Sequence, residues 1–355
     1  MSFDETSESN PARLRISLDE LAGVTTAPTT EGAAGALTPG VKTYGNINAT
    51  PDEPTMAQSK SNILLQGWFY LGVAGLLGAL CGWAINEHAF VDGRGGRWGN
   101  HWMLPSIVAL MCVGFSISES LVERSTRKAL VRAGIALPLG LVLGFVFDLI
   151  ANGVYGIGLA FCHAAGAQTF HNPAVWVVRG IAWMVFGAAG GVVYGIIGKS
   201  MRKTGYGALG GALGAGLGGV VFDPISFATH GGATSRAVGF GLLGLATGIA
   251  MGLVESALKD RWLYVTAGPL AGKQFILYKQ HTTVGSSQEC DIYLFKDPDI
   301  LPNHATLEVK GSRTHLTANG MVYVAGQPVR GVRVLESGSV IQLGRYGFRY
   351  QEKQR

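Results

Sequence analysis

The chain has 355 residues, of which 48% are hydrophobic, only 14% are charged and 53 are glycine. This combination of low charge and abundant glycine indicates a membrane protein and argues against a soluble enzyme. The net charge of +5 is modest, and the basic residues lie mostly beside apolar runs. That distribution favours membrane topology over nucleic-acid binding.

The residue pattern indicates no metal, cofactor or catalytic site. The four cysteines (Cys81, Cys112, Cys162 and Cys290) show neither zinc-ligand spacing nor a disulfide framework. The chain has no nucleophile elbow, Walker loop, HExxH motif or paired acid–base constellation, and the GAGLGG run at 214–219 lies inside an apolar span. We therefore expect no bound metal or cofactor and no enzymatic activity.

Residues 1–61 are polar and rich in Ser, Thr, Pro, Gly and Ala, without sustained apolar periodicity. Such a segment cannot bury enough apolar surface to fold, so we predict a disordered cytoplasmic tail. Its Thr-rich run VTTAPTTEG (24–32) offers hydroxyl groups to a Ser/Thr kinase, with an unmodified flexible tail as the alternative.

Residues 62–258 form a glycine-rich region in which apolar runs alternate with short polar or basic breaks. Each run is near the length that crosses a bilayer, so we predict a helical membrane bundle of six spans, with five or seven as the alternatives. The predicted spans are 63–85, 103–121, 133–151, 174–198, 205–222 and 237–256. The piece GVYGIGLAFC (153–162) is too short to span, so we expect it to be re-entrant or interfacial.

The charges beside these runs predict the orientation of the chain. Basic residues gather after the second, fourth and sixth spans, at Arg124, Arg127, Lys128, Arg132, Lys199, Arg202, Lys203, Lys259 and Arg261. Positive charge favours the cytoplasmic side, and an even number of spans puts both chain ends on one side. We expect a polytopic protein of a bacterial plasma (inner) membrane with both termini in the cytoplasm.

An internal repeat relates two parts of this region. Residues 127–150 align without gaps to residues 202–225, and residues 179–195 resemble residues 236–252. We therefore predict repeated helical hairpins, each closed near the outer membrane interface by an Asp–Arg clamp. The clamp residues are Asp148, Arg179, Asp223 and Arg236, and a pathway for an ion or substrate is the alternative.

Glycine recurs at every fourth position on two predicted spans, at Gly187, Gly191 and Gly195 and at Gly210, Gly214 and Gly218. Glycines with this spacing share one helix face and let neighbouring backbones approach closely in lipid. We expect these faces to be packing surfaces, either within the chain or between copies that self-associate.

From residue 260 to residue 355 the helical pattern gives way to short alternating runs separated by Gly, Pro, Asn, Asp or Ser. Roughly ten short strands in one stretch of this length predict an all-β sandwich. The expected fold class is therefore multi-domain, with an α-helical membrane bundle followed by the sandwich.

Four elements of this region resemble, in the same order, the forkhead-associated (FHA) domain family. TVGSSQECDIYL (283–294) stands where the family has a Gly-Arg turn and an Asp-Ile strand, and ILPNHATLEV (300–309) matches its Ser-x-x-His-Ala element. MVYVAGQPV (321–329) is similar to its Gly-Thr-x-Val-Asn-Gly hairpin, and LESGSVIQLGRYGFRY (335–350) to its closing strands. The resemblance implies an FHA-like β-sandwich.

The resemblance also implies a peptide-binding site. FHA domains bind phosphothreonine peptides through loops at one end of the sandwich, and their histidine braces those loops. By this resemblance Gly285 and His304 are framework residues. The loop residues expected to contact a peptide are Ser286, Ser287, Leu301, Pro302, Asn303 and Asn319.

Two of these loop positions depart from the family. Ser286 stands where the family has its phosphate-binding arginine, and Leu301 stands where it has a serine. Arginine suits phosphate because its planar fork donates two charge-assisted hydrogen bonds. The changes remove two donors and a fixed positive charge, which Lys279, Lys296 or Arg345 would have to replace from neighbouring loops.

The sequence thus favours a membrane-anchored signalling or scaffold protein whose cytoplasmic FHA-like domain binds a protein partner, with or without phosphothreonine. There are two alternatives. The repeats form a small transporter or channel that the sandwich regulates, or the chain is a phosphate-independent component of a membrane assembly. The expected partners are a cytoplasmic protein, membrane lipid and further copies of the chain, but not nucleic acid.

Overall fold

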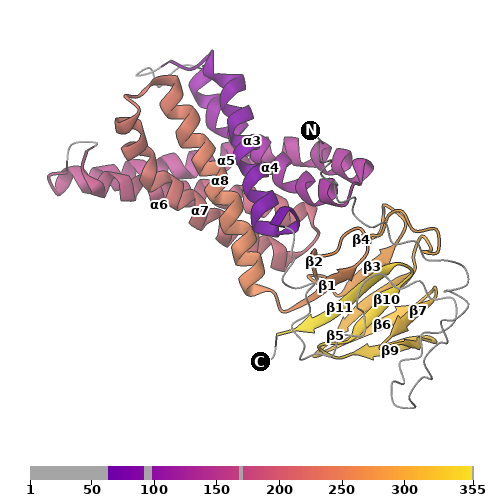
Figure 1. Ribbon diagram of the computed structural model, residues 1–355. Coiled ribbons are helices and arrows are strands. Elements are labelled where there is room, and N and C mark those ends of the chain that lie inside the picture. Colours follow the sequence, from indigo (N-terminus) through magenta and orange to yellow (C-terminus); the bar gives the residue numbers. More distant parts are fainter. Residues whose placement is uncertain (1–62, 92–97, 168–170, 354–355) are drawn as a thin grey trace, which may run out of the picture. The chain divides into compact units, whose positions relative to one another are not determined.

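The computed structural model describes residues 63–91, 98–167 and 171–353. The tail predicted at 1–61 lies outside the described residues. The described chain is helical up to Leu258 and forms strands from Arg261 onward (Figure 1).

Among the described residues, six long helices follow a short 3-10 turn at Ile63–Leu65. They are α3 (Gly67–Glu87), α4 (Trp98–Val122), α5 (Thr126–Ala164), α6 (Pro173–Ile197), α7 (Met201–Ala228) and α8 (Gly232–Leu258). In the described part of the chain, these six helices are long and apolar enough to cross a membrane, judged by length and composition. The count agrees with the six predicted spans.

Helix α5 is longer than predicted. It runs for 39 residues without a break and includes residues 153–162. The prediction of a separate re-entrant piece there is wrong, because a glycine inside a helix costs only about 1 kcal/mol and leaves the backbone hydrogen bonds intact. The helix ends instead at Ala164. Gly166, two residues later, has a φ of +83°, and the Ala167 N–H closes the last turn on the Cys162 carbonyl oxygen.

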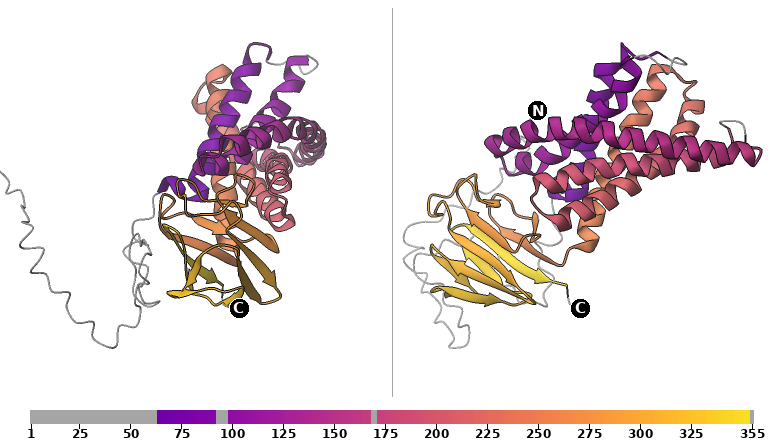
Figure 2. Two further views of the ribbon diagram at one scale, coloured as in Figure 1. Left: turned by 90° about the vertical axis from the view of Figure 1, so that its right-hand side faces the viewer. Right: turned by 180° about the vertical axis from the view of Figure 1, so that it is seen from behind.

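Glycine faces join the helices to one another. Helix α6 packs along α7, and both α7 and α3 pack along α8 (Figures 1 and 2). A Cβ on Gly191 would lie 2.0 Å from the Gly207 carbonyl oxygen, and one on Gly214 would lie 2.4 Å from the Ala246 carbonyl oxygen. Only glycine permits such close backbone approach. Both of these faces therefore pack against helices of the same chain.

The second part of the described chain is a two-sheet β-sandwich. Its strands are β1 (Arg261–Ala267), β2 (Gln274–Ile276), β3 (His281–Gly285), β4 (Ile292–Tyr293), β5 (Ala305–Lys310), β6 (Arg313–Ala318), β7 (Val322–Val324), β8 (Gln327–Pro328), β9 (Val332–Leu335), β10 (Val340–Leu343) and β11 (Tyr346–Glu352). One sheet has the order β2-β1-β11-β10-β7-β8, and the other has the order β4-β3-β5-β6-β9. Strands β3 and β4 are parallel, whereas the other paired strands are antiparallel.

The sandwich encloses an apolar core because side chains alternate along its strands. On β5, Ala305 and Leu307 face inward, and Leu307 is in register with Leu316 of β6. Strand β11 of the other sheet adds Tyr346 and Phe348, which are almost completely buried. The predicted fold class, a helical membrane bundle followed by an all-β sandwich, is confirmed.

Candidate functional site

One histidine holds the loops at one end of the sandwich together. His304 is only 1% exposed, its Nδ1 accepts a hydrogen bond from the Leu301 N–H at 3.0 Å, and its Nε2 donates to the Met321 carbonyl oxygen at 3.0 Å. Because Nδ1 accepts, the ring proton is on Nε2 and the imidazole is neutral. Both ring nitrogens are engaged by backbone groups, which supports the framework role that the resemblance implies.

Gly285 lets strand β3 pass close to the neighbouring loop. A Cβ at this position would lie 2.1 Å from the Pro302 carbonyl oxygen. The Gly285 carbonyl oxygen in turn accepts a hydrogen bond from the Leu294 N–H at 2.9 Å. A side chain here would push β3 away from the loop that His304 braces, so the two predicted framework residues support the same loop.

The two serines after β3 are bonded to the same loop. Ser286 donates its N–H to the Leu301 carbonyl oxygen at 3.0 Å and its hydroxyl to the Ile300 carbonyl oxygen at 2.8 Å. Ser287 donates its N–H to the Pro302 carbonyl oxygen at 3.1 Å. Recognition of a phosphate requires free donors, preferably charged ones. These donors are already used to hold the loop in place.

An exposed surface surrounds these bonds, and we call it the loop-end patch. It consists of Leu301, Pro302, Asn303, Asn319 and Met321. Leu301 is 46% exposed and Met321 is 70% exposed, and His304 binds the backbone of both. The structure therefore brings four of the predicted contact residues together. Sequence reasoning missed Met321, although this apolar residue directly follows the Asn-Gly turn.

Few free cations are available to replace the missing arginine. Lys279 pairs with Asp291 at 2.6 Å, and Arg345 pairs with Asp297 at 3.5 Å. Lys296 is exposed, on a turn where its φ is +62°. Two of the three candidate charges are thus neutralised by neighbouring carboxylates. The chemistry of the loop-end patch, apolar side chains beside amides, suits a polypeptide better than a phosphate.

Asp291 anchors the start of β4 to β3. Its carboxylate accepts hydrogen bonds from the Thr283 N–H at 3.0 Å, from the Thr283 hydroxyl at 3.1 Å and from Lys279. Partial burial acts to raise the pKa of Asp291, but the hydrogen bonds from Lys279 and Thr283 outweigh it and hold the pKa below its usual value. The ionised form is therefore favoured in the folded chain.

A lowered folded-state pKa gives the sandwich an acid-sensitive contribution to stability. This contribution is present above the unfolded-state pKa of about 3.9 and is lost as the pH falls through the folded-state value. We expect the thermal stability of the full chain to fall more steeply below about pH 4 than that of Asp291→Asn, which cannot ionise. Thermal unfolding measured across this pH range checks the prediction, and parallel pH profiles for the two proteins would contradict it.

The β3–β4 loop also contacts the turn between α4 and α5, and helices and sandwich belong to one compact unit. Lys128 donates to the Cys290 carbonyl oxygen, and Arg127 pairs with Glu289 at 3.3 Å. Both cations belong to the basic break from which the membrane orientation is predicted. This break is therefore also a contact surface for the sandwich.

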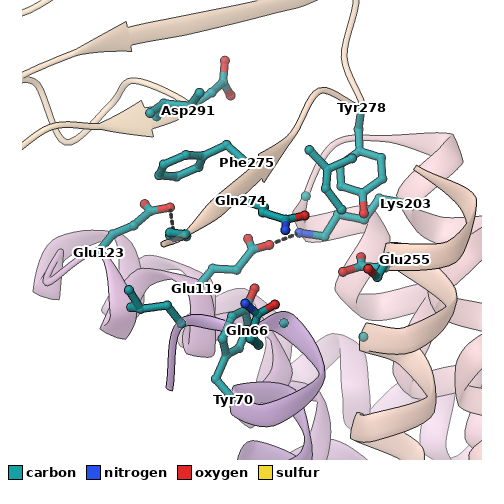
Figure 3. A pocket seen from close by; sticks show the side chains of 18 of the residues that line it. Gln66, Tyr70, Glu119, Glu123, Lys203, Glu255, Gln274, Phe275, Tyr278 and Asp291 are labelled. Carbon is teal, nitrogen blue, oxygen red and sulfur yellow. Dashed lines mark hydrogen bonds and ion pairs between the residues drawn. The ribbon is translucent and has the colours of Figure 1, made fainter. Parts of the chain in front are cut away.

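A cavity of about 140 Å³ lies where the helix ends meet β2 and β4, and charged side chains line it (Figure 3). Lys203 of α7 pairs with Glu119 of α4 at 2.6 Å. Lys273, between β1 and β2, pairs with Glu123 at 2.9 Å, and these two side chains are only 3% and 6% exposed. The first pair joins two helices, and the second, which is buried, connects the sandwich to the end of α4.

Tyr278 of the sandwich lines the same cavity, as does Glu255 of α8 (Figure 3). Burial raises the pKa of Tyr278 well above its usual value, and the negative charges of Glu255 and Glu119 add to this effect. The hydroxyl therefore stays protonated and available as a donor. Sequence reasoning missed this junction. Its one signal was that Lys128 and Lys203, which both contribute to the junction, occupy equivalent positions in the internal repeat.

At the other ends of the helices, the predicted clamps are paired differently. Arg179 lies 2.9 Å from Asp223 rather than against Asp148, and Arg236 pairs with Glu87 rather than with Asp223. The arginines therefore join α6 to α7 and α8 to α3. The physical reason is the glycine-mediated packing of these two helix pairs, which brings their ends together.

Comparisons with known proteins concern the sandwich. Residues 264–354 match the family model described as inner membrane component of T3SS, cytoplasmic domain. No curated protein matches the chain. The chain is similar to the solved FHA domain of CT664 from Chlamydia trachomatis, with 25% identity, a TM-score of 0.25 and coverage of 27% of this chain and 100% of that one.

Two further solved structures show a similar likeness. The FhaA FHA domain, complexed with the intracellular domain of Rv3910, is 21% identical, with a TM-score of 0.24 and coverage of 26% of this chain and 100% of that one. The FHA domain of a hypothetical protein from Arabidopsis thaliana is 20% identical, with a TM-score of 0.25 and coverage of 27% of this chain and 88% of that one.

Proposed function

We propose that this membrane protein, whose C-terminal region is an FHA-like domain, is a non-catalytic interaction protein of the plasma membrane. The loop-end patch binds a cytoplasmic protein, and binding does not require phosphate. One observation carries the proposal. Leu301 and Met321 are exposed next to the buried His304, among the loops through which FHA domains bind peptides.

Phosphate independence follows from the donors that the site offers. A phosphate must give up its hydration on binding, and charged donors are needed to offset that cost. Here Ser286 bonds to backbone carbonyl groups, and Lys279 and Arg345 are paired with carboxylates. An apolar peptide side chain, in contrast, gains free energy when it covers Leu301 and Met321.

The contacts of the sandwich support its placement in the cytoplasm. Lys128 at the start of α5 contacts the β3–β4 loop, and Arg202 at the start of α7 pairs with Asp260, just before β1, at 3.1 Å. Basic turns favour the cytoplasmic side of a membrane, so the sandwich that contacts them shares that side. Tyr70, near the start of α3, lines the same junction cavity, which supports a cytoplasmic N-terminus.

A peptide screen tests the proposal. The full chain in nanodiscs is titrated with a library of unphosphorylated peptides. The affinity of each peptide that binds is then measured for the variants Leu301→Asp and Met321→Asp. We expect each variant to weaken binding by about tenfold or more, because a carboxylate in an apolar contact must be desolvated. Val334→Asp, which places the same charge on the exposed edge strand β9, is expected to leave affinity unchanged. Failure of any peptide to saturate, or equal losses for all three variants, would overturn the proposal.

The family match favours a second candidate function. That family is described as an inner membrane component of T3SS, so the loop-end patch of this chain would bind another member of a membrane assembly. Purification of the full chain from its native membrane in mild detergent separates the two functions. A large complex that Leu301→Asp dissociates supports a role as a component of a membrane assembly. A free chain that still binds peptides supports the first function, binding of a cytoplasmic protein.

A further inference from the structure

A second cavity, of about 560 Å³, lies at the end of the helices opposite to the junction with the sandwich. Aromatic side chains contribute to its wall, from Phe90, Tyr155, Trp183, Phe186, Phe222 and Phe240, together with polar ones such as Asn100, Asn152 and Ser235. This volume and this lining are typical of sites for small organic ligands. The interaction function proposed for the loop-end patch makes no use of this cavity.

The charges around this cavity do not cancel. Arg179 is neutralised by Asp223 at 2.9 Å, and Arg236 is neutralised by Glu87. Asp148 also lines the cavity, but no ion pair among the described residues includes it. The polar side chains that act on its carboxylate are the Asn152 amide and the His101 imidazole, so no lysine or arginine compensates its charge. Ionised groups within membrane segments cost free energy and are generally paired, so a cationic partner would stabilise this carboxylate.

The internal repeat indicates what that partner is. Asp148 and Asp223 occupy equivalent positions, 75 residues apart. The place opposite the Asp223 carboxylate is taken by the Arg179 guanidinium, which also lies 5.1 Å from the ring centre of Tyr155 and 5.7 Å from that of Phe222. In the other copy of the repeat the described chain supplies no arginine or lysine to Asp148, whose one basic neighbour is the His101 imidazole. A ligand's cationic group can take the equivalent place.

We infer that this cavity binds a small organic cation. An alkylammonium or guanidinium group pairs with Asp148 through charge-assisted hydrogen bonds, while an apolar body packs against Trp183 and the neighbouring rings. An anionic ligand is disfavoured, because both arginines of the wall are already paired with carboxylates. The site is independent of the loop-end patch and of its partner.

Dansylcadaverine is a suitable probe, because it joins an alkylammonium group to a fluorescent aromatic body and N-acetylation removes its charge. Energy transfer from tryptophan, including Trp183 in the cavity wall, to the dansyl group reports binding to the full chain. The chain is placed in nanodiscs of phosphatidylglycerol, with empty nanodiscs as the background. We expect saturable energy transfer with the amine. We expect the N-acetyl form to bind at least about tenfold more weakly than the amine.

Substitution of the carboxylate localises the site. Asp148→Asn keeps the size of the side chain and removes its charge, so we expect it to weaken amine binding about tenfold or more and to leave the N-acetyl form unaffected. Asp299→Asn makes the same change on the exposed surface of the sandwich and serves as the control. If Asp148→Asn also unfolds the bundle, the binding of the amine and of its N-acetyl form to the unchanged chain still shows whether the cavity selects a cation. Equal binding of both probes, absence of saturation, or full amine binding by Asp148→Asn would overturn the inference.

The cation can come from a free amine or from the headgroup of an amine-bearing lipid. Nanodiscs of phosphatidylglycerol alone contain no such headgroup, so probe binding in them tests the site itself. Displacement of the probe by added phosphatidylethanolamine identifies a lipid ligand. Unchanged probe binding after this addition identifies a soluble amine. Both results support the cation site, and they distinguish its source.

Discussion

Replacing Gly191 with alanine is expected to destabilise the helical bundle by about 3 kcal/mol, at the upper end of the usual cost of overpacking. The added methyl group would lie 2.0 Å from the carbonyl carbon and oxygen of Gly207 and 2.4 Å from the Ala208 nitrogen. Backbone atoms cannot rotate away as a side chain can, so α6 and α7 must separate and lose contacts along the helix pair. Unfolding of the full chain by SDS in mixed micelles, followed by tryptophan fluorescence, measures the free energy of unfolding.

Gly205→Ala is the matched control for this prediction. Gly205 lies on α7, one of the same two helices, but a Cβ at this position would meet no neighbouring atom within 4 Å. Alanine is the better helix former, so we expect the free energy of unfolding to stay constant or to rise by up to about 1 kcal/mol. If Gly191→Ala and Gly205→Ala had the same stability, close backbone approach would not be what holds α6 to α7.

The second large effect is expected at the junction between helices and sandwich. Lys273→Met removes the ammonium group that lies 2.9 Å from Glu123 and leaves a carboxylate that is only 6% exposed. Loss of one partner from a buried ion pair costs about 3–5 kcal/mol. We expect a value near 3 kcal/mol, because Lys128 remains 3.6 Å from the same carboxylate. Chemical unfolding of the full chain in nanodiscs gives this free energy.

An exposed ion pair of the same sandwich provides the control. Lys310 lies 2.8 Å from Glu308, but its side chain is 62% exposed. Lys310→Met is therefore expected to leave the free energy of unfolding nearly unchanged, because water and salt screen an exposed pair. The double substitution Glu123→Leu with Lys273→Met should restore part of the lost stability, because the Glu123 carboxylate is then not left buried without Lys273. Lys128 loses its ion pair with Glu123 but keeps its hydrogen bond to the Cys290 carbonyl oxygen. Equal costs for Lys273→Met and Lys310→Met would contradict the structural role of the junction.

Much of the fold could be predicted from the sequence because its signals are local. An apolar run long enough to cross a bilayer identifies a helix wherever its neighbours lie, and the part of the chain that the structure describes contains six such helices. The motif around His304 predicts the FHA-like fold because the histidine, the adjacent turn and the strand β5 are contiguous in the chain. The end of α5 could not be placed in this way, because glycine-rich stretches of helix and of loop have similar compositions.

The junction and the true partners of the arginines could not be predicted for a different reason. Lys273 and Glu123 are 150 residues apart, and the pair forms only because the sandwich contacts the turn between α4 and α5. Arg236 likewise pairs with Glu87 because α8 packs along α3. No spacing in a single sequence encodes such pairs. The loss of phosphate donors at Ser286 could be predicted in part. The sequence shows that serine stands in place of arginine, but only the structure shows that its hydroxyl binds the Ile300 carbonyl oxygen.

Phosphate-independent recognition by the loop-end patch is tested most directly by fluorescence anisotropy. The full chain in nanodiscs is titrated with each bound peptide in its phosphothreonine form and in its unphosphorylated form. We predict that the two dissociation constants agree within about threefold, a difference of less than 1 kcal/mol. Binding of the phosphorylated form that is about tenfold tighter or more would contradict this prediction. It would show that Lys296 or another cation replaces the arginine that is absent at Ser286.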